Sequence, residues 1–267
     1  MSVLVEVCID SIRSLSLAEH AGADRIELCS ALRLGGLTPS DGYMQQAAQK
    51  ARIPIYAIIR PREGDFVYAS EEIEVMLQDI ANARQAGCAG VVIGALTPRG
   101  QLALPAIDAM LAQAQGMGVT FHRAFDHCQD PHAALEAILA RPAIERILTS
   151  GQAANALQGK EALKQWVDAT RHTSLTIMPG AGVTPDNAQA ILTTTGAREI
   201  HLSARTEQVS VMQSNACASM GDGDDARYPI TDPASVRLVK AIANRFKPRC
   251  NAVIRQHGNV THSSLLR

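Results

Sequence analysis

The sequence predicts a single closed (β/α)8 barrel, in which eight parallel strands alternate with eight helices. Its 267 residues are close to the roughly 250 that such a barrel usually needs. Short β-branched or apolar runs alternate with longer helical patterns along the chain, and no break in composition divides it. An open, doubly wound sheet is the alternative, but eight strand–helix units in a chain of this length favour closure.

Each predicted element follows from its local pattern. Strands are expected where β-branched and apolar residues lie between turn residues, at 3–9, 25–29, 55–60, 90–94, 119–123, 146–149, 175–178 and 199–203. Helices are expected near 11–21, 39–51, 70–87, 104–116, 131–140, 155–171, 185–194 and 233–247. Capping residues support several helix starts, namely Asp10 or Ser11, Thr38-Pro39, Asp130-Pro131 and Thr184-Pro185.

Two segments depart from this alternation. Residues 205–230 are predicted to form a long loop after the eighth strand. The polar segment 248–267 lacks apolar periodicity, and we expect a disordered tail there, which leaves 1–247 as the barrel domain.

Composition excludes several classes of partner. The chain has 25 basic and 26 acidic residues, a net charge of −1, so it lacks the basic excess of a nucleic-acid binder or of a polybasic membrane anchor. No apolar run is long enough to span a bilayer, and the first residues do not look like a signal peptide. The six cysteines have no C-x-x-C spacing, so we expect reduced thiols and a cytoplasmic location.

The strands place polar residues at one end of the barrel. Active sites of such barrels lie at the C-terminal ends of the strands, and alternate residues of each strand point inward. The polar residues that this pattern brings to the mouth are Glu6, Cys8, Glu27, Cys29, Arg60, His122, His201 and Ser203.

Histidine and carboxylates could do acid–base chemistry there. His122 is the candidate for proton transfer, because histidine titrates near neutral pH, and Glu6, Glu27 and Asp126 would orient it or the substrate. The alternative is structural: the two glutamates pair with arginines inside the barrel, and His122 and His201 are hydrogen-bonded core residues.

Arginines after two strands could bind an anion. Arg60 and Arg62 flank a proline, and Arg123 follows the fifth strand; guanidinium groups bind carboxylates and phosphates with two hydrogen bonds. The alternative is a salt-bridge network at the rim with Glu63 and Asp65. More than half of the few aromatic residues lie in or beside these two segments, which favours a walled pocket.

The end of the seventh strand is rich in glycine. Backbone N–H groups around Gly180 and Gly182, just before a predicted helix, could hold an anion, and His201 and Ser203 on the eighth strand would add polar side chains to this site. The alternative is that these glycines only allow a tight turn.

Two cysteines are candidates for binding a metal ion. Cys8 and Cys29 lie near the ends of neighbouring strands and face the same way, and two thiolates suit a soft ion such as Cu(I). The alternative is that both are small buried core residues.

Several of these segments resemble the CutC family of copper homeostasis proteins. They are Glu6-Val7-Cys8, Asp24-Arg25-Ile26-Glu27-Leu28-Cys29, Gly35-Gly36-Leu37-Thr38-Pro39-Ser40, Ile59-Arg60-Pro61-Arg62 with Gly64-Asp65-Phe66, Thr120-Phe121-His122-Arg123-Ala124-Phe125-Asp126 and Leu148-Thr149-Ser150-Gly151. The resemblance spans roughly 3–246. It implies one TIM-barrel domain, a cytoplasmic homodimer and a role in copper tolerance or Cu(I) binding, with Cys8 and Cys29 as the copper cysteines.

Three functions follow from these patterns. The resemblance favours a cytoplasmic Cu(I)-binding protein without an organic cofactor, and we take this as the predicted function. The number of polar residues at the mouth, more than two thiols need, favours an enzyme that acts on a small anionic or phosphorylated metabolite. A scaffold whose polar mouth is purely structural is the third alternative.

Overall fold

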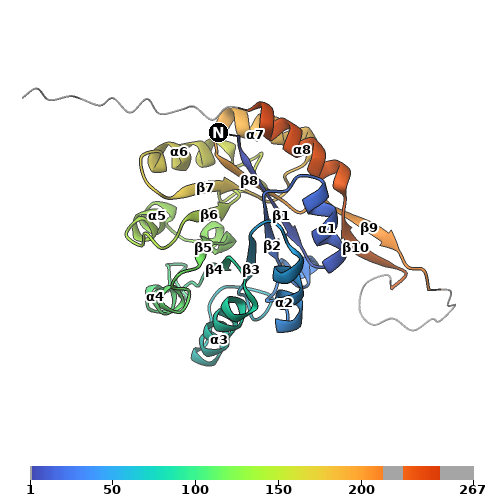
Figure 1. Cartoon of the computed structure of the whole chain (residues 1–267). Helices are drawn as coiled ribbons and strands as arrows, with labels where there is room; N and C mark the ends of the chain where they lie inside the picture. The colour runs from blue at the N-terminus through green and yellow to red at the C-terminus, as the bar shows by residue number, and fades with distance from the viewer. Residues whose placement is uncertain (1, 213–224, 247–267) are drawn as a thin grey trace, which may run out of the picture.

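The protein forms a nearly closed barrel of eight parallel strands surrounded by helices (Figure 1), as the sequence predicts. The computed structural model describes residues 2–212 and 225–246. The strands are β1 (Leu4–Ile9), β2 (Arg25–Leu28), β3 (Ile55–Ile58), β4 (Gly90–Ile93), β5 (Gly118–Phe121), β6 (Arg146–Thr149), β7 (Thr176–Pro179) and β8 (Glu199–Leu202). The helices are α1 (Ile12–His20), α2 (Asp41–Lys50), α3 (Ser70–Ala86), α4 (Leu104–Gln113), α5 (Pro131–Leu139), α6 (Lys160–Thr170), α7 (Pro185–Thr195) and α8 (Pro233–Arg245).

The hydrogen-bonded order of the strands follows the chain around the barrel. It runs β7-β6-β5-β4-β3-β2-β1-β8, and β7 and β8 at its two ends also contact each other. The outward side chains of β1, which are Val5, Val7 and Ile9, are at most 1% exposed beneath the helices. Full burial of one such side chain contributes roughly 1.5–3 kcal/mol, so this aliphatic layer between sheet and helices is the main hydrophobic core.

The interior of the barrel combines polar side chains with a small apolar cluster that includes Tyr56, Ile58 and Val92. Strand pairing sets Glu6 beside Arg25 and His201, and Cys8 beside Glu27. Because inward residues alternate with outward ones, these side chains meet inside the barrel.

Four charged side chains near the N-terminal ends of the strands form what we call the ionic layer: Glu6, Arg25 and Arg146, which are buried, and Glu199, which is partly buried. Arg25 forms ion pairs with both glutamates, and Arg146 Nε lies 3.1 Å from Glu199 Oε2. Barrels of this class are usually filled by branched aliphatic residues. Here the opposite charges neutralise one another, which is the condition for burying them.

The ring of Tyr56 lies against this layer. The guanidinium carbons of Arg25 and Arg146 lie 5.3 and 4.9 Å from its centroid, which is the range of cation–π contacts. Gly90 and Gly118 make room for the ring, because a Cβ at either position would overlap it. The two strand glycines therefore let one large aromatic ring occupy the barrel interior.

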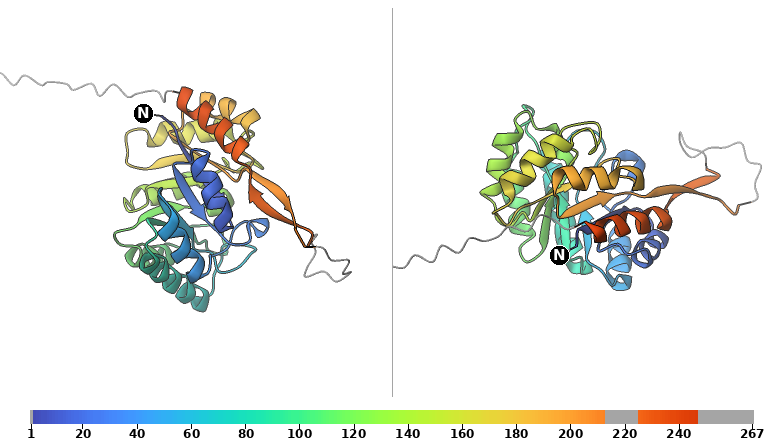
Figure 2. Two further views of the ribbon diagram at one scale, coloured as in Figure 1. Left: turned by 45° about the vertical axis from the view of Figure 1, so that its right-hand side comes forward. Right: turned by 90° about the horizontal axis from the view of Figure 1, so that it is seen from above.

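The prediction of a long loop over residues 205–230 is wrong at both ends of that range. Residues Arg205–Val209 (β9) and Arg227–Thr231 (β10) pair as an antiparallel hairpin, which projects from the barrel next to α8 (Figure 2). We call this hairpin the arm. The sequence of the arm does not show the apolar pattern expected of strands. Strand β9 is largely polar, and β10 contains Pro229, a residue that sheets accept mainly at their edges.

Helix starts agree with most of the capping predictions. Asp130 caps α5 by accepting from His132 N at 3.0 Å and Ala133 N at 3.1 Å, and Thr184 precedes Pro185 at the start of α7. The cap of α2 is Ser40, not Thr38, so that helix begins two residues later than predicted. Helix α6 begins at Lys160 rather than near 155.

Some predictions cannot be compared with the structure. The expected tail 248–267 and positions 213–224 of the expected loop lie outside the described residues. Within the described ranges, no helix is both long and apolar enough to cross a membrane.

Candidate functional site

A cavity of about 520 Å³ opens at the C-terminal ends of the strands, where the sequence predicts the site. Such a volume is typical of a small-molecule pocket. Its lining includes Cys8, Glu27, Arg60, His122, Arg123, Gly182, His201 and Ser203, all of them predicted site residues. The cavity therefore brings together most of the polar residues that strand alternation assigns to the mouth.

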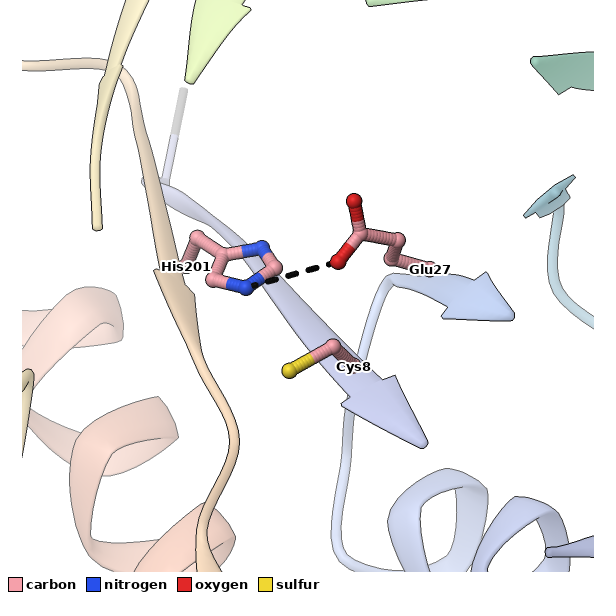
Figure 3. A group of neighbouring side chains, drawn as sticks. All are labelled: Cys8, Glu27 and His201. Atoms are coloured by element: carbon pink, nitrogen blue, oxygen red, sulfur yellow. Dashed lines mark ion pairs between the residues drawn. The ribbon is translucent and has the colours of Figure 1, made fainter. Parts of the chain in front are cut away.

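Three buried side chains form a cluster at the base of this cavity: Cys8 from β1, Glu27 from β2 and His201 from β8 (Figure 3). The ligating atoms of all three lie within 4.8 Å of one another. His201 Nε2 lies 3.7 Å from Glu27 Oε2, and His201 Nδ1 lies 2.8 Å from Glu6 Oε1. The imidazole is thus held between two carboxylates.

Burial and neighbouring charges set the protonation of the cluster. For His201, burial lowers the pKa, but Cys8, Glu6 and Glu27 outweigh it and raise the pKa well above its usual value. Burial raises the pKa of Glu27 to about 7, against the pull of His201. Burial also raises the pKa of the Cys8 thiol. Cys8 can raise the pKa of His201 only as a thiolate, so with a neutral thiol the ionised Glu6 beside Nδ1 holds the imidazole in its charged form, and the carboxyl group of Glu27 is close to its titration point.

Cys29 lies beside this cluster. Its Sγ donates to Glu27 Oε2 at 3.7 Å, but the three-residue group does not include it. Burial, together with the charge of Glu27, raises the pKa of the Cys29 thiol well above its usual value.

Two hydrogen-bond donors in the wall of the cavity have no partner among the described residues: Arg60 Nε and His122 Nε2. The side chain of Arg60 donates to the backbone carbonyls of Leu34, Gly36 and Gly64 over 2.8–3.1 Å, and its guanidinium carbon lies 5.3 Å from the centroid of the Phe66 ring. His122 Nδ1 accepts from Ala124 N at 3.1 Å, which assigns the remaining proton to Nε2.

His122 remains neutral over the physiological range. Burial and the nearby charge of Arg60 lower the pKa of His122 to about 3. The ring lies 4.9 Å from that of Phe66, which also lines the cavity. A neutral imidazole with a free Nε2–H suits hydrogen-bond donation to a ligand better than the proton transfer predicted from the sequence.

Some predicted site residues lie outside the cavity lining. Arg62 forms ion pairs with Glu72 at 2.5 Å and Asp65 at 3.1 Å. Of the two partners in the alternative rim network, the structure shows Asp65, while Glu72 takes the place expected for Glu63. Glu6 lies beneath the cavity, where its ion pair with Arg25 matches the structural alternative. Burial opposes its charge, but Arg25 and His201 lower the pKa of Glu6 to about 2.

Asp126 organises the loop after β6. Its carboxylate accepts from Ser150 N at 3.0 Å and Gln152 N at 3.2 Å, and also from the hydroxyls of Thr149 and Ser150. It pairs with Arg123 Nε at 2.8 Å. Asp126 therefore positions Arg123 at the edge of the cavity through these contacts.

Gly180 and Gly182 have different roles. A Cβ on Gly180 would overlap Leu148 and approach His201, so this glycine lets β7 pack closely against its neighbours. Gly182 lines the cavity and has a φ of 67°, and Ala181 before it has a φ of 73°. A left-handed alanine stores strain of about 1 kcal/mol or more.

Several residues of this region were missed by sequence reasoning. Arg25, Arg146 and Glu199 form ionic contacts below the cluster, while Arg205 and His127 line the cavity. The strand alternation that identified Glu27 and His201 also marks Arg25 and Glu199, which lie two residues earlier on the same strands. Arg205 had no such signal, because its strand was predicted as loop. Of the aromatic residues expected to wall a pocket, Phe66 lines the cavity, whereas Phe121 and Phe125 are fully buried in the core.

Comparisons with known proteins agree with this description. The CutC family profile matches residues 3–206. A CutC family protein of Photobacterium profundum is 50% identical over 250 residues, which cover 92% of this chain and all of that protein. One of Pasteurella multocida is 43% identical and covers 91% of this chain and 99% of its own.

Solved structures give the same result. The crystal structure of the CutC protein of Streptococcus agalactiae, provisionally named a copper homeostasis protein, has a TM-score of 0.70 and 32% identity, covering 74% of this chain and 97% of its own. Phosphoribosyl anthranilate isomerase of Thermotoga maritima has a TM-score of 0.54 at 12% identity over 90% of this chain and 98% of its own, which shows the shared barrel alone. By profile, sequence and structure, the chain belongs to the CutC family.

Proposed function

We propose that the protein serves copper homeostasis in the cytoplasm by binding Cu(I) at the mouth of its barrel. The observation that carries this proposal is the approach of Cys8, Glu27 and His201 to within 4.8 Å. Soft ions prefer thiolate and imidazole to carboxylate, so Cys8 and His201 are the proposed ligands. Cys29, whose thiol lies beside this cluster, is a further candidate ligand. Membership of the CutC family and the provisional name of the Streptococcus relative, a copper homeostasis protein, support this function.

The donor set fits Cu(I) with one condition. Metal ligands must lose their protons on binding, and here burial raises the pKa of the Cys8 thiol while the imidazole of His201 is held in its charged form. Binding therefore has to release protons from the cluster.

The test is a competitive Cu(I) titration under anaerobic conditions against a coloured chelator. We expect Cys8→Ser to weaken Cu(I) binding by about tenfold or more, and Cys29→Ser to weaken it as well. Cys88→Ser and Cys128→Ser are matched controls, since both thiols are buried and free but lie outside the cavity lining. If the double variant of Cys8 and Cys29 binds Cu(I) as tightly as the wild type, the proposed site is wrong.

A second function, catalysis on a small anionic metabolite, is favoured by the free donors Arg60 Nε and His122 Nε2 in the cavity wall. A bare metal ion at Cys8 and His201 would use neither donor, and a cavity of about 520 Å³ accommodates a small molecule. In this proposal Arg60 and His122 bind oxygen atoms of the substrate. The pair of Glu27 and His201 transfers a proton to or from the substrate.

Thermal-shift screening of sugar phosphates and carboxylates tests this second function. We expect at least one class to stabilise the wild type, and we expect the shift to shrink in Arg60→Ala. Because Arg60 also holds two loops together, His122→Gln serves as the second variant. If no compound of either class stabilises the wild type, catalysis on an anionic metabolite is excluded.

A further inference from the structure

The loop between β7 and α7 has a shape that suits an anion. Two successive residues, Ala181 and Gly182, have positive φ angles and line the cavity. Backbone curved in this way can present N–H groups to one point. Among the described residues, no hydrogen-bond acceptor is found for either of these two N–H groups.

Asn187 holds this loop in place. Its Oδ1 accepts from Thr184 N at 2.9 Å, and its Nδ2 donates to Gly182 O at 2.8 Å. The loop leads directly into α7, an 11-residue helix with Pro185 at its start. The N-terminal end of a helix carries a partial positive charge that favours anions.

The opposite wall of the same cavity supplies an independent indication of a ligand. The side chain of His122 is buried, and its Nε2 has no partner among the described residues. Arg60 is likewise buried with a free Nε, and its described contacts contain backbone carbonyls but no carboxylate. A buried donor without a partner costs about 1–3 kcal/mol, and a ligand oxygen would remove this cost.

The charged side chains that line the cavity also favour an anionic ligand. Arg60, Arg123 and Arg205 line it, and although Asp126 pairs with Arg123, Glu27 is the one acidic side chain in the lining. This excess of cations belongs to the cavity, because the whole chain has a net charge of −1. The local charge therefore favours an anionic ligand.

We propose that the mouth of the barrel binds a small phosphate monoester whose phosphate lies on the Ala181–Gly182 backbone at the start of α7 and whose other end accepts hydrogen bonds from His122 and Arg60. The cluster of Cys8, Glu27 and His201 then faces the middle of the ligand. This inference rests on the second function proposed above and names its substrate class. In this arrangement the loop after β7 binds the phosphate group, and Arg60 and His122 on the far wall bind an uncharged oxygen atom of the ligand.

Isothermal titration with glycerol 3-phosphate, inorganic phosphate and glycerol tests the proposal on the full chain. We expect both phosphate-containing probes to bind, the ester more tightly than the free ion, and glycerol not to bind. If only inorganic phosphate binds, the site takes the free ion and the ester proposal is overturned. If neither phosphate probe binds, the proposal also fails, whereas stabilisation by carboxylates in the screen above would leave the broader catalytic function standing.

Two glycines that flank α7 provide a pair of variants with the same φ angle. Gly182 and Gly196 both have a φ of 67°, but they lie at opposite ends of the helix, and only Gly182 lines the cavity. Replacement by alanine imposes the same backbone strain at both, and only at Gly182 would the new Cβ also press on Asn155 Cβ, at 3.1 Å. We expect Gly182→Ala to weaken binding of glycerol 3-phosphate by about tenfold and Gly196→Ala to leave it unchanged. Equal affinities in the two variants would overturn the assignment of the phosphate to this loop.

His122 tests the other end of the ligand. His122→Phe removes the Nε2–H donor while keeping a ring in the wall, and His122→Gln returns an N–H at a similar reach. We expect His122→Phe to weaken binding of glycerol 3-phosphate but not of inorganic phosphate, and His122→Gln to restore it in part. A loss of affinity for both probes alike would contradict the two-ended arrangement.

Discussion

Arg146 links four other side chains inside the barrel. Its guanidinium lies 3.1 Å from Glu199 and 2.8 Å from Glu145, donates to Thr120 Oγ1 at 2.9 Å, and stacks on Tyr56. Removing one partner from such a buried network leaves the remaining charges without compensation. The consequence for stability should far exceed that of breaking a surface ion pair.

We therefore expect Arg146→Met to lower the free energy of unfolding by about 3–5 kcal/mol. The control is Lys164→Met, which breaks an exposed ion pair with Asp168 of 2.6 Å and should cost about 1 kcal/mol or less. Urea unfolding followed by circular dichroism measures both. Equal costs for the two variants would show that the ionic layer does not depend on Arg146.

His122 makes stability depend on pH. The folded protein keeps its imidazole neutral because burial, Arg60 and His127 lower the pKa of His122 to about 3, whereas in the unfolded chain it titrates near 6.5. Between these values the unfolded chain binds more protons, so stability is complete above about pH 6.5 and falls as the pH is lowered.

Replacing His122 should remove this dependence. We expect the difference in unfolding free energy between the wild type and His122→Gln to change by up to about 1.4 kcal/mol per pH unit below pH 6.5. Above that pH the difference should be constant. Urea titrations at pH 5, 6, 7 and 8 measure it, and parallel curves for the two proteins would contradict a buried neutral histidine.

At the scale of elements, helix α8 closes the fold by packing against α7, α1 and β1. Its start is set by Asp232, whose carboxylate accepts from Ala234 N at 3.0 Å and Ser235 N at 3.1 Å. We expect Asp232→Ala to cost about 1 kcal/mol. The control is Asp186→Ala, because Asp186 lies in the first turn of α7 without capping it. Thermal unfolding compares the two, and an equal loss would show that the cap of α8 is unimportant.

How well the sequence predicts each element depends on where its stabilisation comes from. The eight barrel strands were predictable, because burial between helices and barrel interior selects β-branched and apolar residues that alternate with inward polar ones. The arm was not, because β9 is held by pairing with β10 rather than by burial, and its residues are mostly exposed.

The candidate site was predictable to the same degree and for the same reason. Glu27, Arg60, His122 and His201 follow from strand alternation, so the sequence brings them to the mouth. What alternation cannot give is the direction of a side chain in a loop. Arg62 turns to the rim and Asp126 to the loop after β6, and both directions are set by contacts with residues 10 to 26 positions away in the sequence.

At the scale of the whole molecule, the homodimer implied by family resemblance stays a prediction. The arm carries exposed apolar side chains that could meet a second copy, with Val209 53% and Tyr228 43% exposed. We expect light scattering to give twice the mass of one chain, and Val209→Asp to give the mass of a single chain. The control is Val75→Asp, which adds the same charge at a 51% exposed valine on α3. A monomeric wild type would contradict the prediction.

The arm also connects its own exposed apolar surface, around Val209 and Tyr228, with the cavity at the mouth of the barrel. Arg205 is the first residue of β9, yet it lines the cavity, and Ala204 before it, with a φ of 43°, accepts from Asp232 N at the base of the arm. If the mouth binds the anion proposed above, a contact on the arm that displaces Arg205 would change the affinity for that anion. Thermodynamic reciprocity then requires that ligand to change the affinity of the arm for its contact by the same factor.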